Sequence, residues 1–241
     1  MNFHPHPMHL SGKKILITGG SRGLGKATIK QLLEKGAHVT SVSRTKPSHI
    51  HHHLTHVEYD MNSIYTDTQR IDFLKETEFD VLINNVGSSP GLINFQKLNE
   101  EKITATLNIN VLSHVWFTKN IKYKKVVFVG SVCSYITVPE AALYCASKNF
   151  IHSFATALRM EGEDVYIIYP GKINTDLFPQ ISDLFVSRKE NIASYIVNGI
   201  EKEWKTAFIP FFLGFLPIAQ SIIPRFIYEK ILTKVFNWLK K

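Results

Sequence analysis

The chain has 241 residues, a length that suits one large α/β domain or two small ones. Hydrophobic residues make up 44% of it and charged residues 20%, a balance that excludes an intrinsically disordered chain. Its two cysteines provide no disulfide framework, and its first ten residues contain no secretory signal, so we expect a reducing compartment. The net charge of +8 raises the question of an anionic partner.

The positive charge is concentrated near the C-terminus. From Trp204 onward there are six lysines and arginines and one acid, a balance of +5 out of the total of +8. No helix-turn-helix, zinc-finger or RNA-binding signature accompanies this excess, so we expect no nucleic-acid partner. A basic excess on an apolar segment instead favours an anionic membrane surface.

Short apolar runs alternate with helical patterns from residue 13 to about 209. The predicted strands are 13–18, 38–43, 57–59, 80–83, 126–129, 165–169 and 206–209. The predicted helices are 23–35, 99–120, 142–161 and 189–203. Strands separated by helices require right-handed crossovers and a parallel sheet that is covered on both faces. We therefore predict one Rossmann-like, doubly wound α/β domain over residues 1–209, with a sheet of about seven strands.

A glycine-rich turn joins the first predicted strand to the first predicted helix. Residues 18–25 read Thr-Gly-Gly-Ser-Arg-Gly-Leu-Gly. Such glycines let the backbone approach a pyrophosphate, and the helix N-terminus supplies free N–H groups and a positive dipole. The turn by itself is weak evidence, because many strand-to-helix turns need glycine for steric reasons. Its Thr-Gly-x3-Gly-x-Gly spacing is one residue longer than the common dinucleotide fingerprint.

That longer spacing is typical of the short-chain dehydrogenase/reductase family, which this sequence resembles from residue 9 to about 209. Further motifs follow in the order of that family: Asn84-Asn85-Val86-Gly87, Asn110, Ser131, Tyr144-Cys145-Ala146-Ser147-Lys148, and Pro170-Gly171 with Thr175 four residues further. The family usually has alanine in place of Val86. Six motifs in order, at the expected spacings, identify the chain as similar to this family.

The spacing of Tyr144 and Lys148 also has a chemical meaning, because residues four apart share one helix face. A tyrosine with an unperturbed pKa of about 10 is a poor acid or base near neutral pH, and a nearby ammonium lowers that pKa. Ser131 can hydrogen-bond the substrate oxygen. The resemblance implies these roles, and adds that Lys148 holds the nicotinamide ribose and that Asn110 orders a water. We therefore predict an oxidoreductase that interconverts a carbonyl and an alcohol, with a non-catalytic cofactor-binding or sensing protein as the alternative.

The choice of cofactor depends on two arginines. The second predicted strand ends at Ser43 and Arg44, where NAD-preferring relatives usually carry an acid. Arg44 and Arg22 can hold a 2′-phosphate bidentately, so we expect NADP(H), with NAD(H) as the alternative. The resemblance implies further cofactor contacts, namely Gly19, Ser21, Gly23, Leu24, Gly25, Asp60, Met61, Asn85, Val86, Gly87, Tyr144, Lys148, Pro170, Gly171, Ile173 and Thr175.

Five histidines fall within the eight residues from His49 to His56. This composition raises the possibility of a metal site, but no cysteine, aspartate or glutamate at ligand spacing supports one. We therefore expect no metal and a solvated loop near the adenosine end of the cofactor.

The last segment, residues 210–241, is treated as an apolar and basic amphipathic tail. Residues 206–224 carry no charge and are barely long enough to span a bilayer, and two prolines and a glycine interrupt them. The following stretch has Lys230, Lys234, Asn237 and Lys241 on one face and Ile227, Ile231, Val235, Trp238 and Leu239 elsewhere. We favour peripheral contact with a membrane. Packing on its own domain or on a second subunit, and a true span, are the alternatives.

A short lid is expected between Thr175 and about Ile192. Its apolar residues favour a small, lipid-like substrate: Leu177, Phe178, Ile181, Leu184 and Phe185. The glycine-rich last strand through which the family forms tetramers is not visible, and we expect a homo-oligomer, with a dimer favoured. The expected location is cytoplasmic, with the tail as a candidate attachment to the inner face of a membrane.

Overall fold

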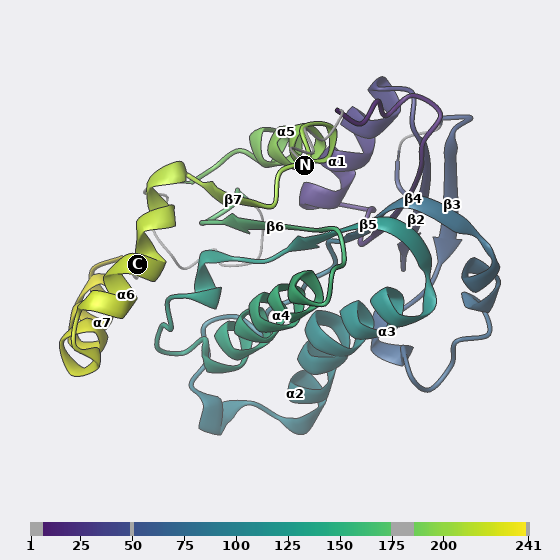
Figure 1. The fold of residues 1–241 in the computed structure, drawn as a ribbon. Helices are drawn as coiled ribbons and strands as arrows, with labels where there is room; N and C mark the ends of the chain where they lie inside the picture. The colour runs from purple at the N-terminus through teal and green to yellow at the C-terminus, as the bar shows by residue number, and fades with distance from the viewer. Residues whose placement is uncertain (1–6, 49–50, 175–185, 240–241) are drawn as a thin grey trace.

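The computed structural model describes residues 7–48, 51–174 and 186–239, and a seven-stranded sheet forms its centre (Figure 1). The strands run in the spatial order β3-β2-β1-β4-β5-β6-β7, and every neighbouring pair is parallel. They are β1 (Lys14–Thr18), β2 (His38–Ser43), β3 (Leu54–Glu58), β4 (Glu78–Asn84), β5 (Lys122–Val129), β6 (Val165–Pro170) and β7 (Thr206–Ile209).

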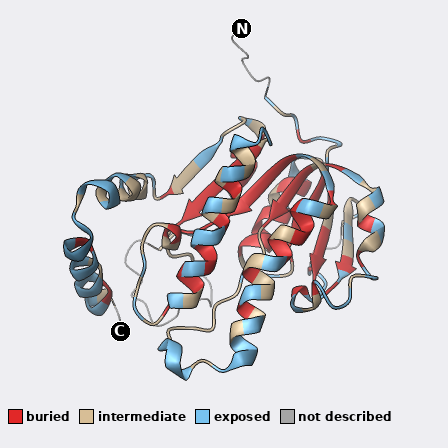
Figure 2. Cartoon of the chain, turned by 60° about the horizontal axis from the view of Figure 1, so that its bottom comes forward, coloured by how far each residue is buried: buried red, intermediate tan, exposed pale blue. Residues whose placement is uncertain are grey.

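Helices cover both faces of the sheet. On one face lie α1 (Gly23–Glu34) and α5 (Lys189–Glu201), and on the other lie α2 (Glu100–Leu107), α3 (Ser113–Asn120) and α4 (Ala142–Met160). Because the central strands are covered on both sides, they are largely buried (Figure 2), and all six residues of β6 are buried. The predicted Rossmann-like fold is confirmed.

The strand order reverses between β1 and β4. From β1 the chain moves outward through β2 to β3, and it then returns to β4 on the other side of β1. Connections at the carboxyl ends of β1 and β4 therefore diverge and leave a crevice, the place where open α/β sheets bind ligands.

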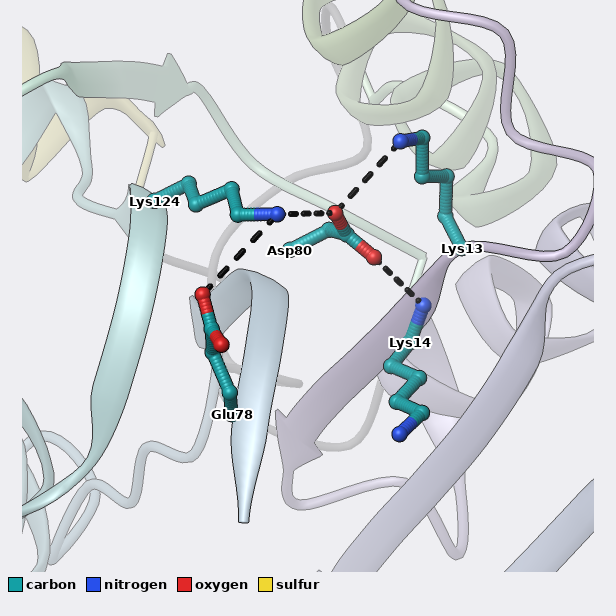
Figure 3. Close-up of polar contacts among 5 residues, drawn as sticks. All are labelled: Lys13, Lys14, Glu78, Asp80 and Lys124. Carbon is teal, nitrogen blue, oxygen red and sulfur yellow. Dashed lines mark hydrogen bonds and ion pairs between the residues drawn. The ribbon is translucent and has the colours of Figure 1, made fainter.

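At the amino end of the sheet, opposite the crevice, an ion-pair cluster around Asp80 joins three strands (Figure 3). The Asp80 carboxylate accepts hydrogen bonds from the Lys14 backbone N–H at 3.0 Å and from Lys124 Nζ at 3.2 Å, and Lys13 Nζ lies 3.5 Å away. Burial by itself would raise the pKa of Asp80, but these hydrogen bonds and lysine charges outweigh it and lower the pKa. The cluster therefore stabilises the fold at neutral pH, and this stabilisation is lost as the pH falls through the lowered pKa and the carboxylate is protonated.

Strand β3 differs from its prediction, since it begins three residues earlier than expected, at Leu54. It is an edge strand that pairs only with β2, and its Thr55 and Glu58 are exposed. Because these polar residues interrupt the apolar run, the pattern predicted only the end of the strand. Residues 51–53 consequently precede β3 and lie at the amino end of the sheet. The expected placement of the histidine-rich loop near the adenosine end of a cofactor is wrong, because the crevice lies at the carboxyl ends of the strands.

The uncharged run at residues 206–224 is divided among several elements. Its first four residues form β7, and the rest form a 3₁₀ turn (Phe211–Phe215) and α6 (Leu216–Ile222), before α7 (Arg225–Leu239). Helices α6 and α7 lie beyond the β7 edge of the sheet (Figure 1). Among the described residues, no helix is both long enough and apolar enough to cross a bilayer.

Candidate active site

The glycine-rich turn connects β1 to α1 at the crevice. A Cβ atom on Gly25 would lie 2.2 Å from the Gly19 carbonyl oxygen, and one on Gly19, where φ is +74°, would lie 2.9 Å from the Val86 Cα. Glycine is therefore required here by the close approach of two backbone segments. The first turn of α1 contains no acid, and Arg22 makes no side-chain hydrogen bond to cap it, so the helix N-terminus suits an anion.

Hydrogen bonds hold the end of β1 against the end of β4. Thr18 Oγ1 accepts from the backbone N–H groups of Asn85 and Val86, both at 3.1 Å. In return, Asn85 Nδ2 donates to the Thr18 carbonyl at 2.8 Å. These contacts fix the glycine turn relative to the segment that follows β4, so the base of the crevice is a rigid cradle.

The crevice is a cleft of about 890 Å³, large enough for a dinucleotide and a small substrate. Sixteen of the residues predicted to bind cofactor line it: Gly19, Ser21, Arg22, Gly23, Leu24, Gly25, Ser43, Arg44, Asp60, Met61, Asn85, Val86, Gly87, Tyr144, Lys148 and Ile173. Pro170 and Gly171 do not, because Gly171 turns toward β7 and donates its N–H to the Ile209 carbonyl at 2.8 Å. Thr175 and the five apolar lid residues lie outside the described residues.

Several lining residues were missed by the sequence analysis. Thr45 follows Arg44 directly and could have been found by extending the end of β2, while Lys26 lies on the first turn of α1. Lys189, at the start of α5, reaches the cleft from a distant part of the chain, and no motif signals it. These two lysines add to the positive charge of the cleft.

Three of the predicted catalytic side chains come together beside the end of β5. Tyr144 and Lys148 lie on the first turns of α4, with exposed fractions of 5% and 4%. Lys148 Nζ donates to the Val129 carbonyl at 3.0 Å and lies 5.9 Å from the centre of the Tyr144 ring. A side-chain hydrogen bond links Ser131 to Tyr144. Tyr144 and Lys148 line the cleft, whereas Ser131 does not line it and is joined to Tyr144 by this hydrogen bond.

The pKa values at this site differ from the expectation. Burial raises the pKa of Tyr144 above its ordinary value, and the hydrogen bond from Ser131 opposes this only in part. Burial also lowers the pKa of Lys148 to about 8. The predicted lowering of the Tyr144 pKa by Lys148 is therefore absent, because desolvation dominates and the lowering contribution comes from the Ser131 hydrogen bond and not from the ammonium. At neutral pH the phenol is protonated and can act as a proton donor.

Asn110 lies in a π-helical turn, Asn108–Leu112, between α2 and α3. Its side chain is fully buried, accepting from the Ser88 N–H at 2.8 Å and donating to Ser147 Oγ at 3.0 Å. The backbone carbonyl oxygen of Asn110 lies 2.7 Å from His114 Nδ1. Burial lowers the pKa of His114 to about 3, so the ring is neutral and can donate there. Asn110 does not line the cleft, and its amide links the segment after β4 to helix α4. Its implied role in ordering a water stays a prediction.

Comparison with known proteins identifies the family of the chain. Residues 13–183 match the model of the short chain dehydrogenase family. This match covers well over half of the chain, and the protein therefore belongs to the short-chain dehydrogenase/reductase family, an oxidoreductase family.

Two curated relatives are named as reductases of keto compounds. The chain is 30% identical over 172 residues to a very-long-chain 3-oxoacyl-CoA reductase of Mycosarcoma maydis, a match that covers 62% of this chain and 48% of the relative. It is 28% identical over 217 residues to a 3-ketodihydrosphingosine reductase of Bacteroides thetaiotaomicron, covering 83% of this chain and 80% of the relative.

Solved structures share the fold. A short chain dehydrogenase from Burkholderia cenocepacia, in complex with NADP, superimposes with a TM-score of 0.75 at 19% identity, and the alignment covers 94% of this chain and 100% of that one. A 3-ketoacyl-(acyl-carrier-protein) reductase from Brucella melitensis, complexed with NADH, gives a TM-score of 0.71 at 21% identity over 83% of this chain and 96% of that one.

Proposed function

We propose that the protein is an NADP(H)-dependent oxidoreductase that interconverts a carbonyl and an alcohol. The observation that carries the proposal is that Tyr144, hydrogen-bonded to Ser131, lies with Lys148 in a cleft whose walls also carry Arg22 and Arg44. The glycine cradle, the open N-terminus of α1 and the size of the cleft fit a dinucleotide. The bound cofactor would supply the hydride.

The residues of the chain account for the proton. During reduction, the protonated Tyr144 donates its phenolic proton to the carbonyl oxygen while the carbonyl carbon gains the hydride, so that an alcohol forms. The Lys148 ammonium stabilises the tyrosinate that remains, and Ser131 donates a hydrogen bond to the reacting oxygen. Asn110 acts by holding α4 in place relative to β4. In the reverse direction, Tyr144 takes the proton from the alcohol.

The preference for NADP(H) rests on the residues around the adenosine end. Arg22 and Arg44 are exposed on the cleft wall, where their guanidinium groups are free to approach a 2′-phosphate. The position at the end of β2, where an acid would select NAD(H), is Ser43, whose hydroxyl donates to the Thr45 carbonyl at 3.0 Å. The solved relatives hold NADP in one case and NADH in another, and we favour NADP(H) because of the two arginines.

For the substrate we propose a long-chain 3-keto lipid derivative, since two of the curated relatives carry names of this class. With NADPH, kcat/KM for a 3-oxo thioester should rise with acyl length, by up to about fourfold per buried methylene. Rates measured on a short and a long 3-oxoacyl thioester test this directly. Equal rates would contradict the lipid assignment alone, whereas no NADPH oxidation with any carbonyl would favour a non-catalytic cofactor-binding protein.

We also propose that α6 and α7 attach the protein to an anionic membrane surface. Tyr228 and Phe236 of helix α7 are buried, and α7 contacts the domain through the Tyr228 hydroxyl, which donates to the Tyr135 carbonyl at 3.5 Å. Large apolar side chains nevertheless remain exposed over the same segment: Phe211, Phe215, Ile218, Ile222, Phe226, Ile227, Ile231, Val235 and Trp238. Arg225, Lys230 and Lys234 accompany them, a combination that suits acidic headgroups.

Co-sedimentation with vesicles tests this attachment. The full chain should sediment with phosphatidylserine-containing vesicles and much less with pure phosphatidylcholine, and high salt should release it. A variant with Phe211→Ser and Trp238→Ser, which removes two of the most exposed apolar side chains, should lose at least about 1.5 kcal/mol of binding per residue. Undiminished sedimentation of the variant would contradict the proposal. So would a stable dimer that buries these residues, measured by light scattering.

A further inference from the structure

Four histidines meet at the amino ends of β2 and β3, whereas the cleft lies at the carboxyl ends of the strands. His51, His52 and His53 form a turn that leads into β3, closed by a hydrogen bond from the Leu54 N–H to the His51 carbonyl at 3.0 Å. The His53 carbonyl accepts from the Val39 N–H at 2.8 Å, which ties the turn to β2. One ring nitrogen from each of the three histidines lies within 4.8 Å of the others. A turn held in this way presents three imidazoles to one point.

The rings are supported by β2 and leave nitrogen atoms available. His38, the first residue of β2, packs against His53, with ring centres 4.0 Å apart, and the ring of His52 also lies 4.0 Å from that of His53. The His53 Nδ1 atom is buried and has no hydrogen-bond partner among the described residues. A buried polar atom without a partner costs free energy, which a bound ligand would recover.

We propose that His51, His52 and His53 bind a divalent transition-metal ion, with Zn²⁺ as the best fit. Neutral imidazoles favour zinc, copper and nickel over magnesium and calcium, and three histidine ligands with one open position form a known type of zinc site. The His51 Nδ1 atom accepts from the His53 N–H at 3.1 Å, a hydrogen bond that holds the His51 ring within the turn. The ring of His38 supports that of His53 from β2. Zinc binding here would revise the sequence-based expectation of no metal.

The position of the site indicates a structural role. None of His38, His51, His52 and His53 lines the cleft, and the five residues of β3 separate the turn from Tyr59 and Asp60, which do. Strand β3 is an edge strand that contacts the sheet through β2 alone. A metal ion held at its first turn, beside β2, would therefore fasten the edge of the sheet without entering the chemistry.

Calorimetric titration of the full chain with ZnCl₂ tests the site, and Co²⁺ absorption reports the ligand geometry. We expect one Zn²⁺ per chain, and a melting temperature raised by roughly 5–10 °C at zinc concentrations near 100 times Kd. His53→Ala should weaken zinc binding at least tenfold and abolish the rise in melting temperature. His38→Ala should weaken binding only a few-fold. His9→Ala is the matched control, because His9 is exposed and is not among the grouped ligands.

Two results would overturn the proposal: the absence of zinc binding at micromolar concentrations, and equal zinc affinity in the wild type and in His53→Ala. The second result would mean that zinc binds adventitiously at other histidines. Should His53→Ala fail to fold, His52→Ala provides the same test, since His52 is exposed and its removal leaves the packing between His38 and His53 intact.

Discussion

Replacement of Tyr144 by phenylalanine should lower kcat by roughly 10²–10⁴-fold while the affinity for NADPH changes little, because the substitution removes the proton donor and leaves the ring. The ring of Tyr144 is buried beside Lys148, so phenylalanine preserves the packing of α4. The steady-state rate is measured by monitoring NADPH oxidation while the carbonyl substrate is varied. The dissociation constant of NADPH is measured separately by fluorescence. Undiminished turnover would remove Tyr144 from the mechanism.

Controls for this substitution separate chemistry from folding. Tyr195→Phe removes a hydroxyl from a half-exposed tyrosine that does not line the cleft, and it should leave kcat unchanged. The pH profile gives a second control. The pKa of Lys148 is lowered to about 8, so its ammonium is present below that pH and is lost above it. Wild-type reduction should therefore decline above about pH 8, while the residual rate of Tyr144→Phe, which forms no tyrosinate, should show no such decline.

Removal of both Arg22 and Arg44 should weaken NADPH binding by roughly 10²–10⁴-fold, since each charge-assisted hydrogen bond to a phosphate contributes about 1.5–3 kcal/mol. Binding of NADH, which lacks the 2′-phosphate, should change far less. The double variant Arg22→Ala/Arg44→Ala is compared with the wild type by measuring Kd for both cofactors. The expected result is therefore a change in preference as well as a loss of affinity.

The matched control for the arginines is Lys46→Ala. Lys46 is an exposed cation two residues beyond Arg44, and it does not line the cleft, so its loss should affect neither cofactor. An equal loss of NADPH and NADH affinity in the double variant would show that the arginines support the fold of the cleft and do not bind the 2′-phosphate.

The features that were predicted correctly from the sequence are those with a local signature. The central strands contain continuous apolar runs, such as Val126–Val129 of β5, and the spacing of Ser131, Tyr144 and Lys148 fixes their places after β5 and on α4. Features that depend on contacts between distant segments were not predictable. The early start of β3 depends on its backbone pairing with β2, and Lys189 reaches the cleft from a distant part of the chain.

The electrostatics of the site also could not be derived from spacing. A separation of four residues places Lys148 on the same helix face as Tyr144, but it gives no measure of how deeply the phenol is buried. In the folded protein, burial dominates and the pKa of Tyr144 rises. The contact between His38 and His53 is similar, because they are fifteen positions apart in the chain and only the β2–β3 pairing brings them together.

The π-helical turn at Asn108–Leu112 has a geometric consequence for the helices on either side of it. One additional residue in a turn rotates everything that follows by about 100° around the helix axis. The upstream helix α2 buries only Thr106, whereas α3 buries five of its eight residues, including Trp116 and Phe117. Loss of one residue here would turn these two aromatic side chains away from the core. The packing of α3 would thus preserve the irregular turn even in a descendant of this chain that had lost all enzymatic activity.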